Sequence, residues 1–221
     1  MGQSIAFLPL NSGASIPQFG FGTYKLTGQD AYDGVRDALE LGYRHIDTAQ
    51  MYGNEAEVGR ALADAPIARK EIFVTSKLNN PNHEPDVARE SLQRSLEDLQ
   101  LDYLDLFLIH WPLPMFYGGD IMPTWRAMES FVDEGLVRSI GVSNFEAHHL
   151  APILEQGRIM PAVNQIESHP YFANRELHRF NAEHGIITED WAPLARGTVL
   201  SEPSIIEIAR EVGARESQVV L

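Results

Sequence analysis

Short apolar runs alternate with longer amphipathic runs seven times along this chain of 221 residues. The apolar runs are nearly continuous, which is typical of strands in a parallel sheet that is buried on both faces. The amphipathic runs carry apolar residues at helical spacing, and several of them end at a glycine, a common helix stop. The pattern predicts strand and helix pairs at residues 18–23 and 28–42, 44–47 and 54–65, 72–78 and 84–100, 103–110 and 122–135, 137–143 and 146–157, 162–167 and 174–185, and 186–191 and 204–213.

Two architectures fit this order of elements, namely a doubly wound open sheet and an eight-stranded α/β barrel. An open sheet that binds a dinucleotide usually has a G-x-G-x-x-G turn after its first strand, and "GFGTYKL" lacks that pattern. We therefore favour a (β/α)8 TIM barrel that begins with a β-hairpin over residues 5–17. Residues 1–221 are interpreted as one barrel domain, because no linker or low-complexity segment interrupts the series. Seven repeats are one short of eight, so we expect a barrel without its last strand, last helix and C-terminal loop.

The composition excludes several classes of binding partner and of functional site. A formal net charge of −14 argues against binding to nucleic acid or to an anionic membrane surface. The chain has no cysteine, which excludes disulfides, a thiol nucleophile and a thiolate metal site and fits a cytoplasmic protein. The N-terminal segment lacks the pattern of a secretion signal, and the longest apolar run, "YLDLFLIHW", is too short to span a bilayer.

Polar residues stand where the predicted strands end. In α/β barrels, functional side chains project from the carboxyl ends of the strands. Each residue also has a structural explanation when it is taken alone: a helix cap for Ser143 and Asn144, or a buried, hydrogen-bonded ring for His110. We expect no metal site, because His148 and His149 are adjacent on a predicted helix and face different directions. The strand ends carry Thr23, Asp47, Lys77, His110, Ser143, Asn144, Gln165, Glu167 and Trp191.

The sequence suggests a proton-transfer group made of Asp47, Tyr52 and Lys77. A tyrosine has a pKa of about 10 and is a weak acid at neutral pH. A lysine about 4 Å away, at an effective dielectric constant of about 20, would favour the phenolate by about 4 kcal/mol and lower the pKa of Tyr52 by about three. Asp47 would keep Lys77 charged and in place, and His110 could orient a carbonyl oxygen against Tyr52.

Donating a proton to a carbonyl oxygen is half of a reduction, and no side chain can deliver hydride to the carbon. A nicotinamide cofactor is therefore implied. Ser143, Asn144 and Gln165, at neighbouring strand ends, could hydrogen-bond a carboxamide. Trp191, at the next strand end, could stack on the nicotinamide ring.

These motifs resemble those of the aldo-keto reductase family. "GYRHIDTAQMYGNEAEVG" (residues 42–59) is similar to the first family signature and includes the active-site Asp47 and Tyr52. "TSKL" carries the family lysine at Lys77, and "IHWP" the histidine at His110. "VRSIGVSNF" resembles the second signature, "AVNQIESHP" contains the family glutamine at Gln165, and "DWAPL" places Trp191 at the nicotinamide-stacking position.

The resemblance implies a (β/α)8 barrel that reduces aldehydes or ketones with NADPH, with Tyr52 as the general acid. It also implies a small-molecule carbonyl substrate and a monomer, similar to the small bacterial branch of diketogluconate and methylglyoxal reductases. "FGTYKL" resembles the first cofactor loop and "PLARG" a second one, at residues 193–197. By this resemblance the cofactor-binding residues are Gly22, Thr23, Asp47, Ser143, Asn144, Gln165, Trp191, Leu194 and Gly197, and the substrate-binding residues are Tyr24, Asn79, His110 and Trp111.

The chain departs from the family pattern at two places. Many members have tryptophan two residues after the catalytic lysine, where this chain has Asn79. The family motif that binds the adenosine 2′-phosphate is absent, so NADPH rather than NADH is implied by the resemblance alone. The alternative to a reductase is a nicotinamide-binding regulatory or redox-sensing protein on the same fold. A structural protein on this fold would tolerate loss of Tyr52 or Lys77, and both are present.

Overall fold

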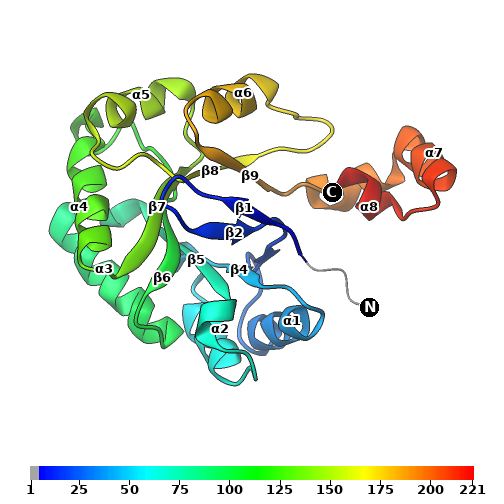
Figure 1. Ribbon diagram of the computed structural model, residues 1–221, viewed down its shortest axis with the longest axis horizontal. Helices are drawn as coiled ribbons and strands as arrows, with labels where there is room; N and C mark the ends of the chain where they lie inside the picture. The colour runs from blue at the N-terminus through cyan, green and yellow to red at the C-terminus, as the bar shows by residue number, and fades with distance from the viewer. Residues whose placement is uncertain (1–4) are drawn as a thin grey trace.

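The centre of the molecule is a curled, parallel sheet of seven strands in the order β3-β4-β5-β6-β7-β8-β9, seen in the computed structural model (Figure 1). The model describes residues 5–221, so the first residues of the N-terminal segment examined for a secretion signal lie outside the described residues. Because spatial order equals chain order, each strand pairs with the next, as in an α/β barrel. The strands are β3 (Phe21–Gly22), β4 (His45–Asp47), β5 (Phe73–Leu78), β6 (Leu104–Ile109), β7 (Val137–Ser143), β8 (Val163–Glu167) and β9 (Ile187–Trp191).

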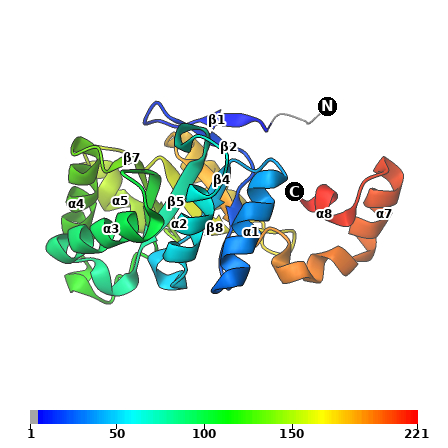
Figure 2. The same cartoon turned by 90° about the horizontal axis from the view of Figure 1, so that it is seen from below.

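The predicted N-terminal hairpin is present as antiparallel strands β1 (Phe7–Pro9) and β2 (Ser15–Pro17). It lies across one end of the parallel strands, as Figure 2 shows. Leu10 and Ile16 pack there against Leu106 and Leu108 of β6, inside the curled sheet. The hairpin therefore fills the end of the sheet opposite the carboxyl ends of the strands.

Helices surround the outer face of the sheet in Figure 1. On β6, Phe107 and Ile109 pack with the helices, whereas Leu106 and Leu108 pack with the hairpin. Both faces of the strand are thus buried, which explains its unbroken apolar run. The helices that follow the first six strands are α1 (Gln29–Glu40), α2 (Glu55–Ala63), α3 (Pro85–Leu99), α4 (Met122–Asp133), α5 (Ala147–Gln156) and α6 (Arg175–Glu183).

The last two helices, α7 (Pro203–Val212) and α8 (Glu216–Val220), differ from this pattern. They project away from the sheet in both views (Figures 1 and 2). Only Ala209 of α7 is buried. The strand and helix order of the first six repeats is confirmed, but the seventh helix does not cover the sheet and α8 was not predicted. The structure shows a curled seven-stranded sheet, and the interpretation as a (β/α)8 barrel without its last strand, last helix and C-terminal loop stays a prediction.

Candidate active site

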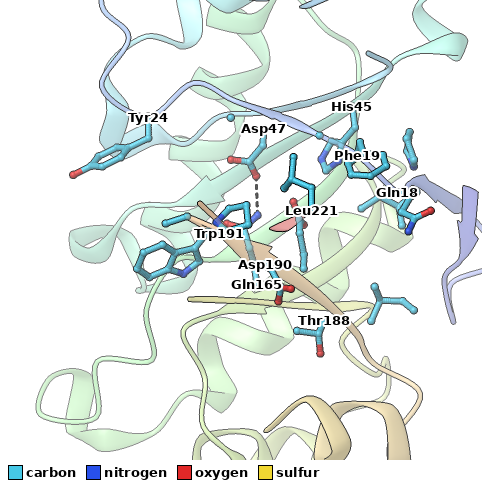
Figure 3. A pocket seen from close by; sticks show the side chains of 18 of the residues that line it. Gln18, Phe19, Tyr24, His45, Asp47, Gln165, Thr188, Asp190, Trp191 and Leu221 are labelled. Carbon is cyan, nitrogen blue, oxygen red and sulfur yellow. Dashed lines mark hydrogen bonds between the residues drawn. The ribbon is translucent and has the colours of Figure 1, made fainter. Parts of the chain in front are cut away.

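The predicted polar side chains meet at the carboxyl ends of the strands. Asp47 is the last residue of β4, Lys77 is the penultimate residue of β5, and His110 directly follows β6. A cavity of about 910 Å³ opens among these strand ends and reaches down to the hairpin. Figure 3 shows part of its lining. Of the predicted site residues, Gly22, Tyr24, Asp47, Tyr52, Trp111, Asn144, Gln165 and Trp191 line it.

Lys77 is fully buried and has three oxygen partners. Its Nζ donates to Asp47 Oδ1 at 2.6 Å, to the backbone oxygen of Thr48 at 2.9 Å and to the Tyr52 hydroxyl at 3.4 Å. Burial alone would lower the pKa of Lys77, but Asp47 and Tyr52 together raise it above its ordinary value. Lys77 is therefore a charged ammonium that connects the acid with the phenol, as the sequence predicted.

Tyr52 reaches the cavity from a short 3-10 helix, Gln50–Tyr52, that begins soon after β4. Gly53 ends this turn with a φ of 65°, a left-handed conformation that glycine adopts readily. Burial, which is the largest effect, together with Asp47 and Tyr24 raises the pKa of Tyr52 by more than Lys77 lowers it, so the pKa lies above its ordinary value. The expectation that Lys77 would lower this pKa by about three is therefore wrong in its net sign, because it left out the desolvation of the phenolate.

The ring of His110 stands edge-on to Tyr52, with the ring centroids 5.8 Å apart. Burial, with a smaller effect from Lys77, lowers the pKa of His110 to about 4, so the ring is neutral at neutral pH. Its Nδ1 is buried without a hydrogen-bond partner among residues 5–221. A neutral ring beside the phenol can hydrogen-bond a substrate oxygen without adding charge.

Asn144 is fixed in the left-handed region, with a φ of 64°. Asparagine tolerates this conformation better than most residues, and it turns the side chain toward the cavity. The Asn144 Nδ2 donates to the His110 backbone oxygen, and its Oδ1 accepts from Trp191 Nε1, both at 3.0 Å. Ser143 Oγ donates to the Gln165 backbone oxygen at 2.9 Å. Asn144 thus connects β6, β7 and β9 at the mouth of the cavity.

Gln165 Nε2 donates to Asp47 Oδ2 at 2.9 Å, the contact that is dashed in Figure 3. Asp47 therefore has one oxygen on Lys77 and the other on Gln165. The second oxygen links the residues predicted to transfer a proton to the residues predicted to bind the carboxamide. A single set of hydrogen bonds thus extends from Tyr52 to the β8 strand end.

Several predicted residues lie outside the lining of the cavity. The Asn79 side chain accepts from the backbone amide of Asn80 at 2.8 Å and caps a short 3-10 helix. The hydroxyl of Thr23 donates to the backbone oxygen of Asp47 at 3.2 Å. Leu194 and Gly197 are not in the lining, although their neighbours Pro193 and Arg196 are. The substrate role of Asn79 and the cofactor roles of Leu194 and Gly197 stay predictions.

Sequence reasoning missed three polar residues that build the site. The Gln50 Oε1 accepts from the Asn79 backbone amide at 2.8 Å, which ties the Tyr52 turn to the end of β5. The Asn54 Nδ2 donates to the Thr23 backbone oxygen at 3.0 Å. Glu189, in the middle of β9, also lines the cavity. The sequence signal for Glu189 was an acidic residue inside a strand predicted to be buried. Gln50 and Asn54 gave no comparable signal.

His45, Asp47 and Glu189 form a group of possible metal ligands, with their ligand atoms within 4.8 Å of one another. Asp47 already binds the Lys77 ammonium, and His45 Nε2 is 2.9 Å from Thr75 Oγ1. The expectation that the site works without a metal stays a prediction.

Comparison with known proteins places these residues in context. The sequence model that describes the aldo/keto reductase family matches residues 18–218 of this chain. An aldo-keto reductase of Mycolicibacterium smegmatis is 44% identical over 97% of this chain and 77% of that protein. Methylglyoxal reductase DkgA of Salmonella typhimurium is 44% identical over 96% of this chain and 76% of its own length. A crystal structure of an aldo/keto reductase from Brucella melitensis has a TM-score of 0.92 and 41% identity, and covers 98% of this chain and 82% of that one.

Proposed function

The chain belongs to the aldo/keto reductase family, and from this premise we propose that it reduces aldehydes or ketones to alcohols with NADPH. The observation that carries the proposal is the Tyr52–Lys77–Asp47 arrangement beside a large cavity. A phenol with a raised pKa holds its proton at neutral pH and has an ammonium next to its oxygen. A general acid must carry its proton when the substrate binds, and a neighbouring cation stabilises the anion that it leaves.

In this mechanism Tyr52 donates its hydroxyl proton to the substrate oxygen as that oxygen gains negative charge. The Lys77 ammonium, 3.4 Å away, stabilises the phenolate that remains. Asp47 holds Lys77 in place and balances its charge inside the fold. His110 is neutral, so it can orient the substrate oxygen without competing for the proton.

The cavity residues fit a nicotinamide group, which would supply the hydride when bound. Asn144 Oδ1 keeps one lone pair beyond the bond from Trp191 and can accept a carboxamide N–H. Trp191 offers an aromatic face in the lining. Two cations, Lys25 and Arg196, also line the cavity, and such side chains bind phosphate groups. The choice of NADPH over NADH rests on the family resemblance.

For the substrate we propose small, reactive aldehydes, because several relatives are named methylglyoxal reductases. Tyr24 and Trp111 are 61% and 41% exposed at the cavity and form an aromatic rim that admits a small molecule.

A helix long and apolar enough to cross a membrane does not occur in the part of the chain described. A monomeric, cytoplasmic enzyme stays our expectation.

The test is consumption of NADPH by the purified protein with methylglyoxal, with NADH in parallel. Tyr52→Phe should lower kcat by about 10²–10⁴-fold and leave NADPH affinity nearly unchanged, because the hydroxyl acts on the proton. Tyr32→Phe is the matched control, since it removes an exposed hydroxyl that donates to Asp64 outside the cavity lining, and it should keep kcat. A Tyr52→Phe variant with most of its rate would refute the assignment. Tight NADPH binding by the wild type without turnover would favour the redox-sensing alternative.

A further inference from the structure

We propose that Gln50 is a positioning residue, whose side-chain amide holds the Tyr52 phenol in place beside Lys77 through a hydrogen-bond network on the outer side of the sheet. Gln50 does not line the cavity, so it acts through Tyr52, which belongs to the same 3-10 turn. The kinetic part of this inference rests on the proposed function. The structural part can be tested without turnover.

All the hydrogen-bonding capacity of the Gln50 amide is used. A glutamine amide accepts two hydrogen bonds at its oxygen and donates two from its nitrogen. The Oε1 atom accepts from the Asn79 backbone amide at 2.8 Å and from Asn82 Nδ2 at 3.1 Å. The Nε2 atom donates to Ser91 Oγ at 3.2 Å and to Ser95 Oγ at 3.0 Å. One side chain therefore connects its turn with the segment after β5 and with helix α3.

The two serines need a donor at position 50. Ser91 Oγ donates its proton to the backbone oxygen of Ala88 at 2.9 Å. Ser95 Oγ donates its proton to Glu55 Oε2 at 3.1 Å. Because a hydroxyl has a single proton, both serine oxygens are left as acceptors. An amide satisfies them, whereas a carboxylate at position 50 would face their lone pairs. The direction of these bonds therefore selects glutamine over glutamate.

The same network reaches the strand that carries Lys77. Glu55 Oε1 accepts from Ser76 Oγ at 2.6 Å, and Ser76 directly precedes Lys77 in β5. Side chains of neighbouring strand residues point to opposite faces, so Ser76 faces the helices while Lys77 faces the inside of the curled sheet. A continuous path of hydrogen bonds thus runs from Gln50 through Ser95 and Glu55 to the residue beside Lys77.

The network lies in surroundings that are otherwise apolar. Its inner side chains, Glu55, Ser76 and Ser95, are buried, and α3 also buries apolar residues such as Leu92 there. Polar groups at such a position cost desolvation, and apolar residues could pack the helices without it. A fully hydrogen-bonded network, however, is rigid and favours one arrangement of the segments that it joins. Helix packing does not require this rigidity, whereas a fixed separation of the phenol and the ammonium does.

The position of Tyr52 depends closely on its turn. The turn is short, with the Tyr52 backbone amide donating to the Ala49 oxygen at 2.9 Å and the Gly53 amide to the Gln50 oxygen at 3.3 Å. The Tyr52 hydroxyl is 3.4 Å from Lys77 Nζ, which is already longer than the usual hydrogen bond. A small movement of the turn would therefore break this contact, and a misplacement of about 1 Å can slow a reaction by about 100-fold.

The structural test is NMR spectroscopy of the full chain with ¹³C-labelled tyrosine rings. The Tyr52 ring centroid is 5.1 Å from that of Tyr24 and 5.8 Å from that of His110, so its resonance reports movement relative to both rings. Tyr52→Phe assigns the resonance. Gln50→Met keeps the length of the side chain but removes all four bonds, and it should shift or broaden the Tyr52 resonance. Gln29→Met is the matched control, because Gln29 donates only to the exposed Asp33, and it should leave the resonance unchanged. An unchanged Tyr52 resonance in Gln50→Met would overturn the proposal.

The kinetic test is the rate of NADPH oxidation in a single turnover with saturating methylglyoxal. Gln50→Met should slow this step by roughly 10–100-fold, with nearly unchanged NADPH affinity and KM, because Gln50 lies outside the cavity lining. Gln50→Glu keeps the size and an acceptor oxygen but loses both donors, and it should be slowed at least as much. Gln29→Met should react like the wild type. A slowing of less than about threefold in Gln50→Met, or a wild-type rate in Gln50→Glu, would refute the positioning role of the amide.

Ser95→Ala tests the same network from the other end and keeps the proposal testable if the Gln50 variants do not fold. Ser130→Ala is its matched control. Ser130 Oγ also donates to a backbone oxygen three residues earlier, that of Ala127 at 2.7 Å, and accepts from Arg89 at 3.2 Å. Ser95→Ala should react more slowly than Ser130→Ala, and equal rates would contradict the proposal. Urea unfolding of each variant shows that it is folded under the assay conditions.

The two tests separate this inference from the proposed function. An inactive wild type would count against carbonyl reduction. The NMR comparison of Gln50→Met with Gln29→Met would still decide whether Gln50 positions the Tyr52 ring.

Discussion

Replacement of Lys77 by methionine tests both the fold and the proposed chemistry. The substitution keeps a long apolar side chain but removes the ammonium that contacts Asp47, Thr48 and Tyr52. An ammonium 3.4 Å from a phenolate oxygen interacts by about 5 kcal/mol at an effective dielectric constant of about 20. If about half of the phenolate charge has developed in the transition state, its loss costs about 2.5 kcal/mol, or about 70-fold in kcat.

The same substitution also affects stability. Lys77 is 0% exposed and Asp47 is 8% exposed, so removal of one partner leaves a buried charge without compensation. Such a change typically costs about 3–5 kcal/mol of unfolding free energy. The raised pKa of Lys77 means that the stabilisation is complete below the unfolded-state pKa of about 10.4 and is lost as the pH rises through the higher folded-state value.

Urea unfolding and steady-state kinetics on three variants separate the two effects. Lys77→Met should unfold at a lower urea concentration and reduce carbonyls more slowly. The double variant Lys77→Met with Asp47→Asn no longer leaves the Asp47 carboxylate unpaired and should recover most of the lost stability, but not the rate. If Lys77→Met keeps a kcat within about threefold of the wild type, the ammonium contributes less than 1 kcal/mol and the proposed role of Lys77 is wrong.

Two further predictions concern the cofactor and the barrel interior. Trp191→Ala should weaken nicotinamide nucleotide binding by roughly 1–3 kcal/mol, the usual scale of stacking on an aromatic ring, and Trp191→Phe should keep most of it. Equal affinities by fluorescence titration in all three proteins would place the nicotinamide ring elsewhere. The pKa of His45 is lowered from 6.5 to about 4, so the unfolded state takes up its proton first as the pH falls from 6.5 to 4. The unfolding free energy should drop by about 3 kcal/mol more in the wild type than in His45→Gln over this range, and equal slopes in urea titrations at several pH values would contradict it.

The strands and helices could be predicted from the sequence where the apolar residues of a repeat are buried in the fold. The strand predicted at residues 137–143 agrees with β7 at both ends, and the helix predicted at residues 84–100 differs from α3 by one residue at each end. The position of α7 could not be predicted in this way. Its sequence has helical periodicity, but periodicity does not tell which surface, if any, covers the apolar face.

The site residues that stand at the ends of strands could be predicted from the sequence. Asp47, Lys77, His110, Asn144 and Gln165 converge because parallel strands bring their carboxyl ends together. Beyond the contacts of Lys77 with Asp47 and Tyr52, the hydrogen bonds of the site were not predictable, because they depend on the register and the rotamers of several elements. The sequence could not show that Gln50 holds the Tyr52 turn against Asn79, or that Gln165 Nε2 donates to Asp47 Oδ2.

The corrected pKa of Tyr52 changes how the role of Lys77 is understood. A lysine that produced a phenolate in the resting protein would remove the proton that reduction requires. Burial prevents this, because together with Asp47 and Tyr24 it raises the pKa of Tyr52 by more than Lys77 lowers it. Yet the same low-polarity surroundings strengthen the attraction between the ammonium and any charge that develops on the phenol oxygen. In the proposed mechanism, burial therefore keeps the proton on Tyr52 until a substrate oxygen takes it, and Lys77 lowers the barrier at that moment.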